Sequence, residues 1–464
     1  EISCSLVGSE MCIRDRTRVA YGGGDVACNI VFGMISALLI FFYTDYVGVS
    51  AVTVGTVMLI SRVFDGFSDV VMGFIVARTK SKYGQSRPWL LWMAIPFALS
   101  AVLLFTVPHT DGFLQSLYIF VTYNFCTTVC YTAVNLPYGS LSAMMTRDSH
   151  ERDILSVFRV GMAQFGKIIA VTFTLPLVKV FGDDQMAWVK CMGLWAILAF
   201  AMLLFCFVRC KETVEIEAVK KQENQHVPVG RTLKAIATNQ YFWAVLILWM
   251  FQNVSQTVIG TILPYYCKYV FHNDDWMYST LYLVETLVIV FVIFLCPLVR
   301  DRLGKRNLVV IGSVIALGGH ALFLLNPTSF TWCLITTVIR AIGEAPLNAF
   351  VFGMIGDVVE FGQWKTHLRQ ESFIFAGGSV GTKIGSGVAS ACMTSIMSAF
   401  GYISSTAQNV VQPESAITAI ANIYKFSPIL IWGTVLIVGL LYQLDKKYPS
   451  IMQELAAREM CGEL

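Results

Sequence analysis

The sequence predicts an all-α membrane protein with twelve transmembrane helices in two six-helix bundles. Of its 464 residues, 56% are apolar and only 14% are charged, whereas soluble domains are about one quarter charged. Apolar runs of roughly 20 residues, the length that crosses a hydrocarbon core, recur along the whole chain. Lysine and arginine gather in alternate gaps between these runs, as they do in multi-pass membrane proteins.

The limits of the apolar runs place the helices in chain order. They lie at about 26–46, 51–77, 89–107, 114–136, 157–181, 187–208, 241–267, 277–299, 308–325, 329–354, 372–399 and 416–443. The longest hydrophilic gap, at 209–240, divides them into an N-terminal bundle within 17–208 and a C-terminal bundle within 241–443. We therefore expect residues 209–240 to form a cytoplasmic linker and residues 444–464 a cytoplasmic tail.

The first stretch, EISCSLVGSEMCIRDR at 1–16, differs in character from the rest. It lacks the basic region followed by an apolar region that marks a signal peptide. It resembles the translation of a sequencing adapter, so we expect a non-native artefact and exclude it from the fold.

The basic residues predict the orientation of the helices. Every second gap is rich in Lys and Arg, for example ARTKSKYGQSR after the second span and VRDRLGKR after the eighth. The alternate gaps carry little beyond Lys179 and Lys268. Because basic loops stay in the cytoplasm, we expect a cell-membrane protein with both termini in the cytoplasm. The likeness of the two basic loops also fits the repeated halves of secondary transporters, although short basic loops recur by chance as well.

Several function classes lack their sequence signals. No GxxxxGK(S/T) stretch is present, and GGGD at 22–25 lacks the strand and turn of a phosphate-binding loop. Most of the thirteen cysteines are scattered through apolar runs, and the spacing of Cys126 and Cys130 is unlike a zinc site. The net charge of +3 forms no nucleic-acid patch. We expect no enzyme activity, no bound cofactor and no nucleic-acid partner, and we expect energy to come from an ion gradient.

The second span carries charges where lipid would surround them. In SRVFDGFSDVV, Asp65 and Asp69 are four residues apart and share one helix face, with Arg62 close to that face. One carboxylate at a helix centre costs about 2.5–3.5 kcal/mol to insert. One arginine cannot neutralise two carboxylates, so the remaining charge requires a proton, a metal cation or a lysine from another helix.

Other residues could complete a cation site around this pair. Ser68 beside the pair and Thr132 in the fourth span offer hydroxyl groups, which suit a small hard cation. Lys383 lies in the glycine-rich stretch GGSVGTKIGSG of the eleventh span, where close helix approach could bring it to the acidic face. The alternative is a static ion-pair cluster that only locks helices together.

Further polar residues recur within the apolar runs, and their donors and acceptors suit a polyhydroxylated solute. They are Asp25 in the first span; Tyr131, Thr132 and Asn135 in the fourth; Arg159 in the fifth; Gln252 and Gln256 in the seventh; Glu285 in the eighth; and Arg340, Glu344 and Asn348 in the tenth. The alternative for each is hydrogen bonding between helices. We expect His320 in the ninth span to be a buried, satisfied histidine without a role in proton transfer.

Three stretches resemble the glycoside–pentoside–hexuronide:cation symporters, the melibiose-permease branch of the major facilitator superfamily. They are DVACNIVFGMISALLIFFYTD, similar to the family's first helix; RVFDGFSDVVMGFIVARTKSKYGQSRPW, similar to its second helix and following loop; and GDVVEFGQWKTHLRQES followed by Lys383, similar to its signature between helices ten and eleven. The resemblance runs from about Val19 to the tail. It implies the major facilitator superfamily fold and secondary active transport by alternating access, in which Na⁺ or H⁺ moves together with a sugar.

The polar residues and the resemblance together give three candidate sets. In the resemblance, Asp25 and Arg159 match sugar-contacting positions, and Lys383 matches a lysine that bears on the cation site. The cation-binding set is Asp65, Asp69, Ser68 and Thr132, with Asp65 and Asp69 as Na⁺ ligands if the carrier uses sodium. The substrate-binding set is Asp25, Tyr131, Asn135, Arg159, Asn348 and Lys383. The coupling or gating set is Arg62, Lys383, Arg87, Asp357 and Trp364.

The chain also departs from the melibiose-type pattern. Melibiose-transporting members have Asp, Trp, Lys and Trp at the positions of Asn135, Gly139, Gly24 and Asn348, so melibiose itself is not the expected substrate. QWK at 363–365 is more similar to glucuronide- and pentoside-type members. Arg159 is kept, but the aspartate at the position of Asn135 is not. This combination favours an acidic sugar, because guanidinium pairs well with carboxylate.

We therefore expect a monomeric secondary carrier that couples a glycoside, pentoside or hexuronide to Na⁺ or H⁺. Cation binding at Asp65 and Asp69 would remove the cost of leaving them unpaired, and the loaded halves would rock about a midplane site. Arg87 and Asp357 are either gate residues or solvated loop residues. Two other functions stay open: a lysolipid or other amphiphile carrier of the same superfamily, and a non-transporting membrane receptor.

Overall fold

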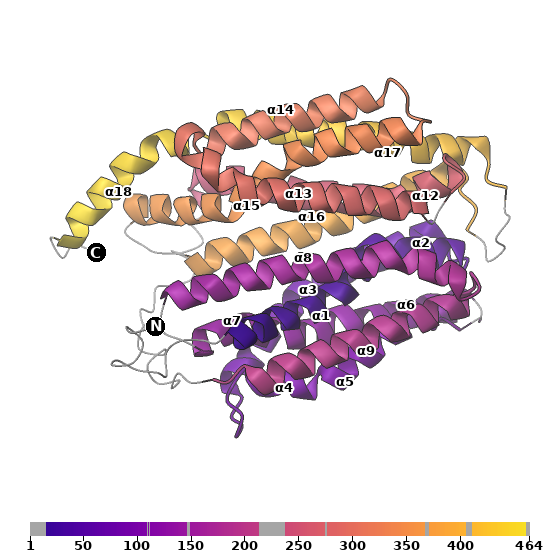
Figure 1. Ribbon diagram of the computed structural model, residues 1–464, viewed down its shortest axis with the longest axis horizontal. Helices are drawn as coiled ribbons and strands as arrows, with labels where there is room; N and C mark the ends of the chain where they lie inside the picture. Colours follow the sequence, from indigo (N-terminus) through magenta and orange to yellow (C-terminus); the bar gives the residue numbers. More distant parts are fainter. Residues whose placement is uncertain are drawn as a thin grey trace. The chain divides into compact units, whose positions relative to one another are not determined.

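The computed structural model describes residues 15–108, 110, 112–145, 149–212, 237–273, 276–366, 371–404 and 411–460. Within these ranges the only regular elements are helices, apart from one isolated bridge between Ser81 and Gly84. The described helices form two compact units, α1–α9 and α12–α18 (Figure 1). The prediction of an all-α protein is confirmed. Residues 1–14 and most of the predicted linker lie outside the described residues.

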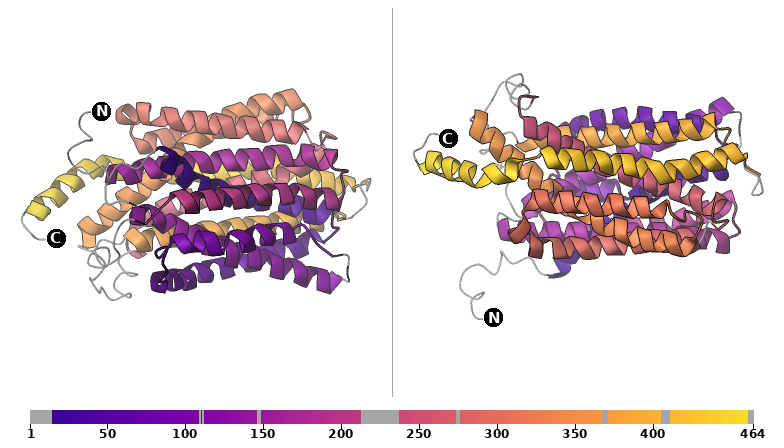
Figure 2. Two further views of the ribbon diagram at one scale, coloured as in Figure 1. Left: turned by 60° about the horizontal axis from the view of Figure 1, so that its bottom comes forward. Right: turned by 90° about the horizontal axis from the view of Figure 1, so that it is seen from above.

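The first unit is built from long helices that run nearly parallel or antiparallel to one another (Figure 2). Its elements are α1 (Asp15–Ala37), α2 (Leu39–Asp45), α3 (Ala51–Arg78), α4 (Arg87–Trp92), α5 (Ala94–Leu103), α6 (Gly112–Asn124), the π-helix η1 (Phe125–Tyr131), α7 (Thr132–Met145), α8 (Ser149–Val180) and α9 (Gln185–Arg209). Helix α1 packs against both α8 and α9.

The second unit has the same general character. Its elements are α12 (Gln240–Tyr269), α13 (Trp276–Leu303), α14 (Lys305–Phe323), α15 (Phe330–Thr366), α16 (Glu371–Ala399), α17 (Glu414–Leu441) and α18 (Leu444–Met460). Helix α14 packs against α15 and α17, and α12 packs against α16 and α17. The last helix, α18, contacts α15.

Ten helices in the described part of the chain are long and apolar enough to cross a membrane. They coincide with ten of the twelve predicted spans. The predicted span at 89–107 is divided at Met93 into α4 and α5. Pro96 follows this break; it has no N–H to donate to the carbonyl of Trp92, so regular helix is interrupted. The predicted span at 372–399 is one helix of 29 residues, α16, rich in Gly, Ser and Thr.

The predicted start of the first span, near residue 26, is wrong. Helix α1 begins at Asp15 and continues through GGGD, although glycine is a poor helix former in solution. A Cβ on Gly22 would lie 2.4 Å from the sulfur of Met162 on α8, and a Cβ on Gly24 would lie 2.5 Å from Cε2 of Tyr138 on α7. These glycines therefore lie within α1 and allow it to pack closely against α7 and α8.

Helices α14 and α15 touch backbone to backbone, also through glycine. A Cβ on Gly343 would lie 2.3 Å from the backbone nitrogen of Ala316 and 2.6 Å from the carbonyl oxygen of Gly312. A Cβ on Gly319 would lie 2.9 Å from the backbone nitrogen of Arg340. Small residues permit this kind of contact between membrane helices. The crossing places the side chain of His320, which follows Gly319 on α14, against the polar face of α15.

We predict that Gly343→Ala destabilises the protein, because the added methyl group has no room between α15 and α14. Overpacking of this kind costs about 1–3 kcal/mol, so the melting temperature in detergent should fall by several degrees. The matched control is Gly318→Ala on the same pair of helices, where an added Cβ meets nothing within 4 Å. Equal melting temperatures for both variants would contradict the close crossing.

Candidate functional site

Asp65 lies in the interior of the first unit, on the unbroken helix α3. Its carboxylate is buried, with 4% of the residue surface exposed. One oxygen, Oδ1, accepts hydrogen bonds from Thr128 Oγ1 at 2.6 Å and Thr127 Oγ1 at 3.3 Å. The other, Oδ2, lies 3.4 Å from Nη1 of Arg62, one turn earlier on α3. Hydroxyls and one guanidinium thus replace the water that this carboxylate loses.

The π-helical stretch η1 explains how two consecutive threonines reach the same oxygen atom. A π-helix is wider than an α-helix, because its hydrogen bonds span five residues, and such turns are frequent at functional sites. The hydroxyl oxygen of Thr132, at the start of α7, lies 3.4 Å from the carbonyl oxygen of Thr127, five residues earlier. Sequence reasoning missed Thr127 and Thr128. The two threonines stand about one turn before Thr132 in FCTTVCYT. The residue types do not show that this stretch is π-helical.

Asp69 lies one turn after Asp65 and shares its surroundings. Its Oδ1 accepts a hydrogen bond from Thr132 Oγ1 at 3.3 Å. Ser68 Oγ lies 3.4 Å from the Thr132 hydroxyl and 3.2 Å from the backbone carbonyl of Asp65. The structure therefore brings together the four residues that the sequence suggested as cation ligands, together with Arg62. That they bind a cation stays a prediction.

The chemistry of this group is that of a hard-cation site. Two carboxylates and the hydroxyls of serine and threonine offer oxygen atoms, the ligand type of small hard cations. Arg62, Asp65 and Asp69 sum to a formal charge of −1, so one monovalent cation or one proton makes them neutral. Among the described residues, no cluster of three or more His, Cys, Asp or Glu side chains could hold a metal ion.

A second polar group of the first unit joins α1 to α8. Arg159 Nε lies 3.3 Å from Asp25 Oδ2, and the Arg159 guanidinium lies over the ring of Tyr138 at 5.2 Å. The Tyr138 hydroxyl donates to the carbonyl of Tyr21 at 2.6 Å. About a third of the Arg159 side chain is exposed, 32%, against 10% for Asp25. Arg159 can therefore present free N–H groups to a solute while Asp25 holds its orientation.

Two departures noted in the sequence acquire physical reasons here. The ring of Tyr138 fills the space beside Gly24, so a longer side chain at that position would displace it. A Cβ on Gly139 would lie 3.6 Å from Nη1 of Arg159, so a large side chain there would crowd the guanidinium. Tyr131 stacks on Phe32 at 5.6 Å, and the half-buried Asn135 lies one turn beyond it on α7. Tyr131 is held by aromatic packing.

In the second unit, Asn348 belongs to a cluster of amide side chains. Its Oδ1 accepts hydrogen bonds from Gln252 Nε2 at 2.5 Å and Gln256 Nε2 at 3.0 Å, both on α12. Its Nδ2 donates to the carbonyl of Glu344 at 3.0 Å. From the sequence alone, Gln256 is either a solute-binding residue or a hydrogen-bonding residue between helices. The structure joins it to the predicted substrate residue, so the three amides form one group.

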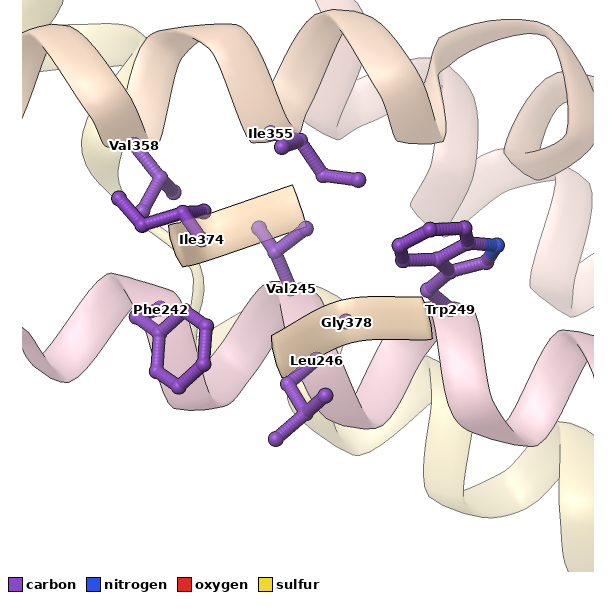
Figure 3. Close-up of a pocket in the computed structure, with 8 residues that line it drawn as sticks. All are labelled: Phe242, Val245, Leu246, Trp249, Ile355, Val358, Ile374 and Gly378. Carbon is purple, nitrogen blue, oxygen red and sulfur yellow. The ribbon is translucent and has the colours of Figure 1, made fainter. Parts of the chain in front are cut away.

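Lys383 lies half-buried on α16, in the second unit, whereas the acidic pair lies in the first. That Lys383 approaches the pair stays a prediction. Glycines on α16 pack tightly on α12: a Cβ on Gly378 would lie 2.4 Å from Trp249, and a Cβ on Gly381 would lie 2.6 Å from Leu246. Beside this contact is a pocket lined by α12, α15 and α16 (Figure 3). Its lining is apolar except for the indole of Trp249, so it is not built for a sugar.

Arg87 is the first residue of α4 and makes its contacts inside the first unit. Its Nε donates to the carbonyl of Phe207 at 2.8 Å, and its guanidinium lies 4.5 Å from the Phe207 ring. Glu212, just after α9, accepts from the backbone N–H groups of Gln85, Ser86 and Arg87 at 2.8, 2.8 and 2.6 Å. A carboxylate is stabilising at a helix N-terminus. Sequence reasoning missed Glu212, since its partners are more than a hundred residues away.

The second unit repeats this arrangement. Arg306, at the start of α14, donates through Nη2 to the carbonyl of Leu440 at 2.7 Å, near the end of α17. Asp445, just after α17, accepts from the backbone N–H of Arg306 at 2.7 Å. Gly84 and Gly304 precede the two helix starts, with φ of +109° and +78°, a conformation that favours glycine. The resemblance between the two basic loops therefore has a structural counterpart in each unit.

The other two gating candidates make contacts within the second unit. Asp357 lies inside α15, not after it, because that helix continues to Thr366. Both Asp357 oxygens accept from Lys305 Nζ at 2.6 Å. The indole of Trp364 donates to Glu454 Oε2 on α18 at 2.6 Å. Sequence reasoning found Asp357 and Trp364 but neither partner, because the partners come from other helices.

Two comparisons of sequence bear on this site. A profile of the family described as MFS/sugar transport protein matches residues 20–446. The chain is 32% identical over 447 residues to the isoprimeverose transporter of Lactiplantibacillus pentosus, covering 94% of this chain and 90% of that protein. It is 30% identical over 452 residues to the glucuronide carrier protein homolog of Escherichia coli, covering 96% of each.

Solved structures resemble the fold. A D-xylose-proton symporter superposes with a TM-score of 0.60 at 13% identity, covering 90% of this chain and 96% of that chain. A bacterial homologue of the human lysosomal transporter Spinster superposes with a TM-score of 0.65 at 11% identity, covering 93% and 96%. At such low identity, these likenesses show a shared fold alone.

We predict that Thr128→Val destabilises the protein, because the variant keeps the shape of threonine but removes the shortest hydrogen bond to the buried Asp65 carboxylate. Hydrogen bonds to charged groups are worth about 1.5–3 kcal/mol, so thermal unfolding in detergent should begin several degrees lower. Thr128→Ser, which keeps the hydroxyl, should unfold near the wild-type temperature.

The matched control for this test is Thr56→Val, which changes an exposed threonine on the same helix as Asp65. It should have little effect. A Thr128→Val protein as stable as the Thr56→Val protein would show that this hydroxyl does not support Asp65.

Proposed function

The chain belongs to the family of MFS/sugar transport proteins, and from this premise we propose that it is a secondary carrier that moves a sugar together with a cation. The resemblance to the glycoside–pentoside–hexuronide:cation symporters is confirmed by this match and by the relatives named as an isoprimeverose transporter and a glucuronide carrier homolog. The sugar is a glycoside, pentoside or hexuronide, and the cation is Na⁺ or H⁺.

The observation that carries this proposal is the pair of carboxylates within α3. Asp65 and Asp69 are one turn apart and are surrounded by hydroxyls. Carboxylates are costly in a membrane interior, and Arg62, Asp65 and Asp69 together carry a negative charge, so a cation at this pair would stabilise the helix packing around it. A cation that enters and leaves would make the stability of that packing depend on the ion gradient. This dependence is what a symporter needs to connect its cargo to a gradient.

The sugar would be held by groups that replace the water around its hydroxyls. In the first unit, Asp25 offers acceptor oxygens and Arg159 offers donors. Tyr131 is the last residue of η1, and Asn135 lies on α7, which follows it. In the second unit, Asn348 with its two glutamine partners offers amide donors and acceptors. Each hydroxyl removed from water must be paired again. Coupling then means that cation and sugar each raise the affinity for the other by the same factor.

The protein is a multi-pass membrane protein of a transport family. We further propose that it lies in the cell membrane as a monomer, with both termini in the cytoplasm, since basic residues favour that side. Its relatives are named as carriers, so we assign it no catalytic residues and no cofactor other than the transported cation.

The test is uptake of labelled sugars into proteoliposomes under an imposed Na⁺ gradient or pH gradient. We predict that Asp65→Asn and Asp69→Asn abolish gradient-driven accumulation, because each removes a charge that the cation would neutralise. Exchange of sugar at equal concentrations needs no net cation movement and should persist in at least one of the two variants. Glu414→Gln, an exposed change at the start of α17, should accumulate sugar like the wild type. Full accumulation by Asp69→Asn would refute the cation assignment.

Arg159 allows the sugar class to be tested. We predict that Arg159→Ala lowers uptake of a labelled β-glucuronide by about 10- to 100-fold, because a charge-assisted hydrogen bond to the uronate is lost. Uptake of a neutral disaccharide such as isoprimeverose should fall less. Arg159→Lys keeps the charge without the forked geometry, so it should recover part of the glucuronide uptake. Equal losses for both sugars would count against an acidic substrate.

A further inference from the structure

The second unit contains a buried cluster of ionisable side chains that the proposed cation and sugar sites do not use. Glu285 comes from α13, His320 from α14, and Arg340 and Glu344 from α15. His320, Arg340 and Glu344 are 2%, 3% and 3% exposed. The close crossing of α14 and α15 through Gly319 fixes His320 against this face of α15. Four ionisable groups in such a place require partners or a proton.

One half of the cluster is an ion pair, although the buried Nε of Arg340 has no hydrogen-bond partner among the described residues. Arg340 Nη2 lies 3.1 Å from Glu285 Oε2, and Arg340 Nη1 lies 2.9 Å from the hydroxyl of Tyr424 on α17. The guanidinium also lies 5.4 Å from the centre of the Tyr424 ring. Arg340 and Glu285 therefore neutralise each other.

The other half is not satisfied. His320 Nε2 and Glu344 Oε1 lie 3.6 Å apart. Within the part of the chain that the structure describes, neither atom has a hydrogen-bond partner. Buried polar atoms are nearly always paired. Two unpaired atoms that face each other, one on an imidazole and one on a carboxyl group, are complementary to a single proton.

The charges of the cluster lead to the same conclusion. With Arg340 and Glu285 paired, the sum is zero only if His320 and Glu344 together hold one proton. Without that proton the cluster carries one uncompensated negative charge, which is strongly unfavourable at this burial. With the proton on Glu344, the acid can donate to His320 Nε2. An imidazolium at His320 would instead place a second cation beside Arg340.

Among the residues that the structure describes, the remaining polar groups around the pair offer no replacement cation. They are Glu285 on α13, Cys333 on α15, Tyr424 and Trp432 on α17, and Ser255 on α12 through its hydrogen bond with Trp432. All are neutral or acidic. A proton is therefore the charge-balancing ligand that these neighbours leave room for.

We propose that His320 and Glu344 form a proton-binding site in the second unit, distinct from the carboxylate pair in the first, and that its occupancy changes the affinity of the amide cluster for sugar. The connection is short: Asn348 donates to the backbone carbonyl of Glu344 at 3.0 Å, one helical turn away. Movement of the Glu344 side chain on losing its proton would shift this turn of α15. The connection to sugar rests on the proposed function, whereas the proton site does not. His320 thus has a role that the sequence did not predict.

Infrared difference spectra of the purified protein, titrated from acid to alkaline pH, test the site without any sugar. The wild type should show the carbonyl band of a protonated carboxylic acid that disappears at alkaline pH. Glu344→Gln should lack this band, and Glu414→Gln should retain it. Identical carbonyl regions in wild type and Glu344→Gln would overturn the proposal.

A second variant covers the case in which Glu344→Gln does not fold. His320→Gln removes the imidazole that faces the acid, so the titration midpoint of the same band should move by roughly one pH unit or more. A band unchanged in position and midpoint would overturn the proposal as well.

The connection to sugar is tested by the half-saturating concentration for equilibrium exchange, at several pH values, of whichever labelled glycoside the wild type transports. This value should vary with pH in the wild type by about an order of magnitude and should be constant in Glu344→Gln. Equal pH dependence in both proteins would refute the connection. If the wild type exchanges none of the sugars, the proposed function fails, while the infrared band still decides whether the proton site exists.

Discussion

The structure depends on one constraint: a charged side chain inside an apolar helical bundle must be given partners that replace water. The apolar helices follow from composition and require little explanation beyond length. The ionisable residues within them are costly, so each must have a specific arrangement around it. Those arrangements are what distinguish this chain from a generic bundle of membrane helices.

The two units meet this constraint in different ways. In the first, Asp65 and Asp69 accept hydrogen bonds from hydroxyl groups, and Arg62 on the same helix lies close to Asp65. Hydroxyls can ligate an ion as readily as they donate to a carboxylate. In the second, Arg340 is matched by Glu285, and what is left is an imidazole facing a carboxyl group. The first arrangement suits a small cation, and the second suits a proton.

The sequence predicted these features where the information was local. Hydropathy located the spans, and spacing of four residues on one helix placed Asp65 and Asp69 together. The prediction from hydropathy failed at the start of α1, because glycines that break helices in water permit close packing between membrane helices. Thr127 and Thr128 were missed because a π-helical register cannot be read from residue types. The sequence did not show that Arg340 and Glu344 lie beside His320, because these neighbours belong to another helix.

The two units have similar contacts at the ends of certain helices. In each unit, a glycine with positive φ precedes a helix whose first arginine binds carbonyls near the end of a later helix. An acidic residue just beyond that later helix, Glu212 or Asp445, accepts from the backbone N–H of the arginine. This framework needs one glycine, one arginine and one acidic residue, whose partners are backbone groups, so the rest of the sequence can differ between the units. The buried charges depend on particular side chains, and these are arranged differently in the two units. A repeated scaffold therefore carries two unlike charged sites, and the function has to be argued from those sites and not from the scaffold.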